Sequence, residues 1–84
     1  MALYKQPYNT YSDQMTAERH AASTARFYMR ETHVIRDNID FVVLGNFHLF
    51  SMPRHERRQL DIVAAYTSNG ERQRHSRSIF YNAF

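Results

Sequence analysis

The sequence predicts an all-α fold, a small bundle of three to four helices with an irregular N-terminal arm. Apolar residues recur at three- and four-residue spacing over 15–29, and similar stripes run through 39–50 and 54–66. The 84 residues suffice for one small domain, which would remove only about two-thirds of its unfolded surface from water. The alternative is an α+β fold in which Gly45-Asn46 forms the turn of a hairpin.

Residues 1–11 are predicted to form the arm, because they contain Pro7 and show neither helical nor alternating periodicity. Three tyrosines lie in this segment: Tyr4, Tyr8 and Tyr11. A tyrosine ring combines an apolar body with a polar tip, so these side chains would order the arm only by packing on a surface. They are therefore candidate interface residues.

The first helix is predicted to begin after Ser12 or Asp13, either of which can cap it. Asp13 and Glu18 also lie toward the positive end of the helix dipole, where acidic side chains are favourable. The apolar face is rich in alanine, which permits close helix packing, and it continues to about residues 32–35. Its members are Met15, Ala17, Ala21, Ala22, Ala25, Tyr28 and Met29.

Residues 37–51 fit two different structures. As a helix capped by Asp37, they place apolar side chains at i, i+3, i+4, i+8 and i+11: Ile39, Val42, Val43, Phe47 and Phe50. As strands, IDFVVL and FHLFSM flank Gly45-Asn46 in a two-residue hairpin. A glycine inside a helix costs about 1 kcal/mol relative to alanine, whereas burying one phenylalanine contributes about 1.5–3 kcal/mol. The unbroken stripe therefore favours a helix over 39–50.

A further amphipathic helix is predicted over 54–66, with Ser51 as its cap and Pro53 in its first turn. The orientation of this helix about its axis buries one set of side chains and exposes another. The buried set is Leu60, Ile62, Val63 and Tyr66, and the exposed set is Arg54, Arg57 and Arg58. Asn69-Gly70 would then end the helix in a left-handed conformation.

The segment FSMPRHERRQLDIVAAY, residues 50–66, is similar to the first helix of the helix-turn-helix in LuxR-type regulators and sigma-factor region four. In those families a Ser/Thr-Pro-Arg-Glu-Arg start leads into a leucine-rich helix, and here His55 is an additional residue within that start. The resemblance implies a helix over 50–66. Residues 67–80 do not match the supporting and recognition helices that should follow, so we assign no family.

The basic residues of this chain are almost all arginine, with ten arginines and one lysine. A guanidinium is a planar fork of donors that suits phosphate and carboxylate groups. Residues 1–40 balance to zero, so the net charge of +3 comes from the C-terminal half, which has six arginines and three acids. The alternative is a solvated helix face followed by a charged tail. The candidate residues for binding nucleic acid or another anionic partner are Arg54, Arg57, Arg58, Arg72, Gln73, Arg74 and Arg77.

The C-terminal tail, residues 71–84, is basic at first and aromatic at its end. It is predicted to form either a fourth helix or an extension that docks through its aromatic side chains. Tyrosine, phenylalanine and arginine are common at the centres of protein interfaces. The candidate interface aromatics of the tail are Phe80, Tyr81 and Phe84.

Enzyme chemistry has no support in the sequence. The absence of cysteine excludes thiolate metal sites and cysteine nucleophiles. The run from His55 to Gln59 lacks the second histidine of a zinc-binding H-E-x-x-H motif, and the five histidines share no spacing of three or four residues. Two glycines cannot supply a phosphate-cradling loop. We therefore expect no catalytic residues, no metal and no cofactor.

Two functions from different classes fit these features. The first is a small, basic, non-enzymatic regulator that binds nucleic acid or a nucleoprotein machine through its C-terminal arginines. The second is an inhibitor or adaptor, encoded by a phage or mobile element, that binds an acidic protein surface. The longest apolar run, 41–44, is far short of the ~20 residues that span a bilayer, so we expect a cytoplasmic protein, in the host cytoplasm if viral. A homo-oligomer would add buried surface to so small a core.

Overall fold

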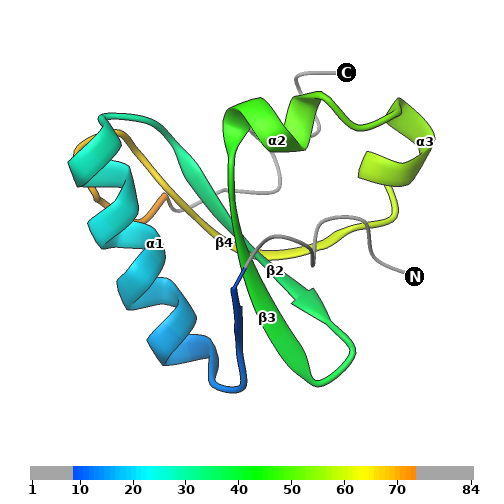
Figure 1. Cartoon of the computed structure of the whole chain (residues 1–84), viewed down its shortest axis with the longest axis horizontal. Coiled ribbons are helices and arrows are strands. Elements are labelled where there is room, and N and C mark those ends of the chain that lie inside the picture. The colour runs from blue at the N-terminus through cyan, green and yellow to red at the C-terminus, as the bar shows by residue number, and fades with distance from the viewer. Residues whose placement is uncertain (1–8, 74–84) are drawn as a thin grey trace.

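The computed structural model of the chain describes residues 9–73, which form an α+β fold instead of the predicted helical bundle (Figure 1). One long helix packs on a four-stranded antiparallel sheet with strand order β1-β3-β2-β4. Two short helices lie on the opposite side of the sheet from the long one. The elements in chain order are β1 (Thr10–Tyr11), α1 (Gln14–Tyr28), β2 (Thr32–Asp37), β3 (Asp40–Gly45), α2 (Asn46–Phe50), α3 (Arg54–Arg57) and β4 (Asp61–Tyr66).

Helix α1 begins as predicted and ends earlier than predicted. Asp13 is its cap, because the carboxylate accepts hydrogen bonds from the backbone N–H of Thr16 at 2.9 Å and from its hydroxyl at 3.0 Å. Met29 adopts a left-handed conformation with φ of 55°, and its N–H donates to the carbonyl of Ala25. The helix therefore stops well before residues 32–35.

Alanines attach α1 to the sheet. Ala17, Ala21 and Ala25 are fully buried, as their four-residue spacing predicts. Their small side chains bring the helix backbone close enough for the hydroxyl of Thr32, on β2, to donate to the carbonyl of Ala21 at 2.8 Å. Other members of the predicted apolar face remain exposed, namely Met15, Tyr28 and Met29.

Residues 39–50 do not form one helix, and no hairpin turns at Gly45-Asn46. The hairpin instead joins β2 to β3 around Asn38 and Ile39, with Asn38 in a left-handed conformation at φ of 61°. Gly45 is the last residue of β3 and the N-cap of α2. Both the predicted helix and its hairpin alternative were therefore wrong for this segment.

The helical stripe misleads here because the sheet is covered on both faces. Phe41 and Val43 of β3 pack on the α1 side, whereas Val42 and Leu44 pack with α2. A strand that is buried on both faces is a continuous apolar run, in which helical spacing occurs as readily as alternation. The turn signal at Gly45-Asn46 does not resolve the ambiguity either, because the hairpin turns at Asn38 and Ile39 instead.

Residues 54–66 also differ from the predicted helix, since only α3 is helical and 61–66 form β4. The same cause applies, because Ile62 packs with α2 and Ala64 with α1. The register between β2 and β4 shifts and leaves Val63 as an extra residue in β4. Tyr66 is buried as predicted, while Leu60 and Val63 are only half-buried. The resemblance to a helix-turn-helix fails for the same reason, because a strand replaces the second half of the expected helix.

The predicted stop at Asn69-Gly70 is a turn, but it follows a strand instead of a helix. Gly70 has a φ of 83°, and a Cβ there would lie 2.5 Å from a carbon of the Arg26 side chain, so the turn requires glycine. The chain then returns beside β4, pairing Arg72 with Tyr66.

Within residues 9–73, no helix is long and apolar enough to cross a membrane. In the same range, no group of three or more histidine, aspartate or glutamate side chains is arranged to hold a metal ion.

Candidate functional site

Helices α2 and α3 form a two-helix unit over one face of the sheet. Leu49 of α2 is fully buried and packs with Met52 and Leu60, which flank α3, in a cluster that includes Ile35 and Val42 of the sheet. This cluster holds α2 through one side chain only. Three other α2 side chains are exposed, namely Phe47, His48 and Phe50.

Arg57 joins the two short helices. Its guanidinium donates hydrogen bonds to the backbone carbonyl of Phe50 at 3.2 Å and to that of Met52 at 3.4 Å. The same guanidinium lies over the Phe50 ring, with Cζ 4.9 Å from the ring centroid, which is cation–π geometry. Arg57 was predicted to point to solvent as a binding residue. It is half-buried and positions α2 relative to α3.

Arg54 and Arg58 are exposed, as predicted. They lie one helical turn apart on the same side of α3, since the N–H of Arg58 donates to the carbonyl of Arg54 at 3.0 Å. Phe47 is 73% exposed and Phe50 is 41% exposed, although both were predicted to belong to a buried stripe. We call these five residues the α2–α3 surface: Phe47, Phe50, Arg54, Arg57 and Arg58.

The charge of this region is positive. Residues 46–60 contain three arginines and a single acid, Glu56. His48 lies against Phe47 in an edge-to-face contact, with ring centroids 5.7 Å apart, and His55 is exposed. Along the chain, residues 46–60 therefore carry a net positive charge, although Asp61 follows them directly and the Glu31 carboxylate lies at the start of α2.

The start of α2 is fixed by a polar contact that sequence analysis missed. His33, a buried residue of β2, contacts the Oδ1 atom of Asn46 through Nε2 at 2.5 Å. The Asn46 amide donates in turn to the carboxylate of Glu31 at 3.0 Å. Burial lowers the pKa of His33 below its ordinary value, and the contact with Asn46 and the charge of Glu31 only partly oppose this. A neutral histidine thus links the sheet to α2.

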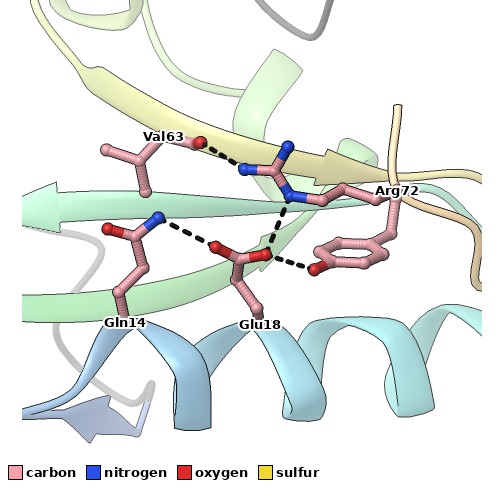
Figure 2. A network of polar contacts seen from close by, with 5 residues as sticks. Gln14, Glu18, Val63 and Arg72 are labelled. Carbon is pink, nitrogen blue, oxygen red and sulfur yellow. Dashed lines mark hydrogen bonds and ion pairs between the residues drawn. The ribbon is translucent and has the colours of Figure 1, made fainter. Parts of the chain in front are cut away.

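Arg72 lies on the other side of the sheet, beside α1, and is not part of the α2–α3 surface. Its Nε donates to Oε1 of Glu18 at 2.9 Å in an ion pair, and the side chain is 51% exposed (Figure 2). Tyr66 donates its hydroxyl to the same carboxylate oxygen at 2.5 Å, and Gln14 donates to the other oxygen at 2.8 Å. The sequence predicted Arg72 as a partner contact, but the fold supplies an internal carboxylate for it.

The pKa values in this network favour its present protonation state. Burial alone would raise the pKa of Glu18, but hydrogen bonds from Tyr66, Arg72 and Gln14 outweigh burial and lower it. Burial and the hydrogen bond to Glu18 raise the pKa of Tyr66 to about 12. At neutral pH the carboxylate is therefore charged and the phenol neutral. Neither group is suited to exchange protons with a substrate near pH 7, and the network serves to attach α1 to β4.

Gln73 was predicted to hydrogen-bond a partner, but its side chain is buried, with 8% of the residue exposed. Its backbone N–H donates to the carbonyl of Ala65 at 2.8 Å, which continues the pairing beside β4. The two polar atoms of its amide have no hydrogen-bond partner in the structure as far as it is described. A buried amide in this position is not available to read the edge of a base.

Tyr11 has a structural position. Its ring stacks on His20 with centroids 4.7 Å apart and packs with the α1-side core, and its backbone pairs with Phe41. The remaining candidates lie outside the described residues, and they are Tyr4, Tyr8, Arg74, Arg77, Phe80, Tyr81 and Phe84.

The chain was compared with protein families, curated proteins and solved structures. No protein-family model, curated protein or solved structure was found to match the chain. The case for the α2–α3 surface therefore depends on its own residues.

Proposed function

We propose that the protein binds nucleic acid through the α2–α3 surface. The observation that carries this proposal is a ring that is 73% exposed, Phe47 on α2, together with exposed Arg54 and Arg58 on and just after α3, the helix that Arg57 joins to the end of α2. Guanidinium groups pair with phosphates, and aromatic rings contact bases. Such binding requires no catalytic group, in line with a non-enzymatic regulator.

Arg57 has a supporting role in this proposal. Its hydrogen bonds to the carbonyls of Phe50 and Met52 connect α3, which begins at Arg54, to the end of α2, which carries Phe47 and Phe50. A preformed surface loses less conformational freedom on binding than one that must be ordered by its ligand. Arg72 is left out of the interface, because it lies beside α1 and its Nε is paired with Glu18.

The test compares two double variants that remove the same charge from different sides of the protein. Arg54→Ala/Arg58→Ala changes the α2–α3 surface, and Arg19→Ala/Arg30→Ala removes two exposed arginines of α1 and the residues after it. Binding to fluorescently labelled 12-nucleotide DNA and RNA strands is measured by anisotropy over a salt series. The plot of log Kobs against log salt has a negative slope. If Arg54 and Arg58 each neutralise one phosphate, their loss makes that slope less steep by about 1.4. At 0.1 M salt this corresponds to a loss of roughly 25-fold in affinity.

The control double variant should keep the parent's slope and affinity within about twofold. Equal losses in the two variants would show that net charge alone drives binding, which contradicts a defined surface. If the parent binds neither strand but captures an acidic protein that survives nuclease treatment, the protein is an adaptor or inhibitor and the present proposal is wrong.

A further inference from the structure

The Phe47 ring offers a face for stacking. Its contact with His48 is edge to face, with an interplanar angle of 77°. An edge-to-face contact covers at most one face of the Phe47 ring. The exposed fraction of 73% agrees with an uncovered face. Phe50 differs, because the guanidinium of Arg57 already lies over its ring.

The backbone beneath Phe47 is held from two sides. Asn46, the preceding residue, is fixed to β2 by His33 and to Glu31 by its own amide. Leu49, two residues later, is fully buried in the sheet-side cluster. A ring carried on backbone that is anchored in this way can bind a flat ligand without first being ordered.

A flat ligand that also carries phosphates fits the rest of the surface. Arg58 is exposed, and it lies one turn from Arg54 on α3, the helix that Arg57 attaches to α2. An oligonucleotide strand carries an anionic backbone and π-faced bases, so it can contact arginines and an aromatic ring together.

Building on the proposed function, we infer that the α2–α3 surface takes single-stranded nucleic acid and that a base stacks on the ring of Phe47. Base faces in a duplex are covered by neighbouring bases, whereas an unpaired strand can present them to an aromatic side chain. The lengths of the two helices also favour a single strand. Helix α2 has five residues and α3 has four, so each is about one turn long. A helix of about one turn presents few side chains to the major groove, which is about 12 Å wide.

The absence of tryptophan from the sequence permits a direct measurement of stacking. Phe47→Trp places a single indole at the site, and its fluorescence is recorded during titration with dT12, with rU12 and with a 12-base-pair duplex. Phe27→Trp is the matched control, because Phe27 is 78% exposed but lies on α1, across the sheet. We expect dT12 and rU12 to quench the Phe47→Trp indole strongly, and the duplex to quench it little. The Phe27→Trp indole should respond little to any of the three.

Affinity gives the second readout. Phe47→Ala should weaken binding of dT12 and rU12 by roughly 5- to 150-fold, the range for losing one stacked base, and Phe47→Tyr should restore it. Phe27→Ala should bind like the parent. Thermal melting checks that each variant folds, and if Phe47→Ala does not fold, the quenching of Phe47→Trp decides the question.

The outcomes separate this inference from the function on which it rests. If Arg54→Ala/Arg58→Ala weakens binding while Phe47→Ala does not and Phe47→Trp is not quenched, the surface contacts only the phosphate backbone and the stacking inference is wrong. Tighter binding of the duplex than of either strand would also overturn it. If Phe27→Trp is quenched in place of Phe47→Trp, the strand binds at the end of α1, and both proposals fail.

Discussion

Arginine has different surroundings on the two faces of the sheet. On the α1 side, Arg72 meets an internal carboxylate and contributes to holding the fold together. On the other side, Arg54 and Arg58 are exposed, and the phenylalanines of α2, Phe47 and Phe50, are exposed as well. A count of arginines along the sequence therefore does not distinguish those that hold the fold together from those that lie on the α2–α3 surface.

The largest effect is expected from Leu49→Ala. Leu49 is fully buried, and its truncation should lower the free energy of unfolding by about 2–5 kcal/mol through lost burial and the cavity that remains. Chemical denaturation of the variant and the parent measures the difference. Because Leu49 holds α2 on the sheet, binding of dT12 should weaken as well. A variant of unchanged stability would show that α2 is not packed on the sheet in solution.

Glu18→Ala should destabilise the protein by about 1–3 kcal/mol. The substitution removes the acceptor of hydrogen bonds from Tyr66, Arg72 and Gln14, and it leaves the Tyr66 hydroxyl without its partner. Denaturation measures the loss, and affinity for nucleic acid, measured well below the melting temperature, should not fall. Weaker binding in the folded variant would show that the α1 side affects binding, which would contradict a purely structural role for Glu18.

The two sides should lose stability in different pH ranges. The folded-state pKa of His33 is below 6.5, so its stabilising contribution is complete above pH 6.5 and is lost as the pH falls through the folded value. The pKa of Glu18 is below 4.5, so its contribution is lost only in more acidic solution. Melting temperatures are measured at pH 7.5, 5.5 and 3.5. His33→Gln should reduce the loss of stability between pH 7.5 and 5.5, and Glu18→Gln should reduce the loss between pH 5.5 and 3.5. Identical pH profiles for parent and variants would contradict both assignments.

The smallest effects are expected from single arginine substitutions. Arg72→Ala should cost up to about 1 kcal/mol of stability, because its ion pair is half exposed to solvent, and should leave affinity unchanged. Arg58→Ala should change stability by no more than about 0.5 kcal/mol and weaken binding of dT12. Melting and anisotropy measured on the same samples give both quantities. The opposite pattern would place the binding arginines beside α1.

Helix α1 could be predicted from the sequence because both of its signals are local. Asp13 lies three residues before the N–H that it caps, and the buried alanines follow at four-residue intervals on a helix that is exposed on its other side. The strands could not be predicted in this way. Residues 41–44 and 62–66 pack against helices on both faces of the sheet, which removes the alternation that identifies a half-buried strand.

The same limit applies to the candidate site. The exposure of Arg54 and Arg58 was predicted from a helical rotation that holds only over α3, and Arg57 of the same set is half-buried. Arg72 could not be assigned, because its carboxylate partner lies 54 residues away. Phe47 was assigned to a buried stripe that disappears once β3 ends at Gly45.

The Arg72 side chain has a further consequence for the outer border of the sheet. Strand β4 is an edge strand whose end is paired by Arg72 and Gln73, and edge strands expose backbone groups on which a strand from another molecule can pair. The guanidinium of Arg72 donates to the carbonyl of Val63 at 3.4 Å, at the extra residue where β4 is already irregular (Figure 2). A charged group and a bulge at the same point make this border a poor template for intermolecular pairing. The ion pair with Glu18 holds that guanidinium beside the bulge, so one side chain both attaches β4 to α1 and occupies a backbone acceptor of β4.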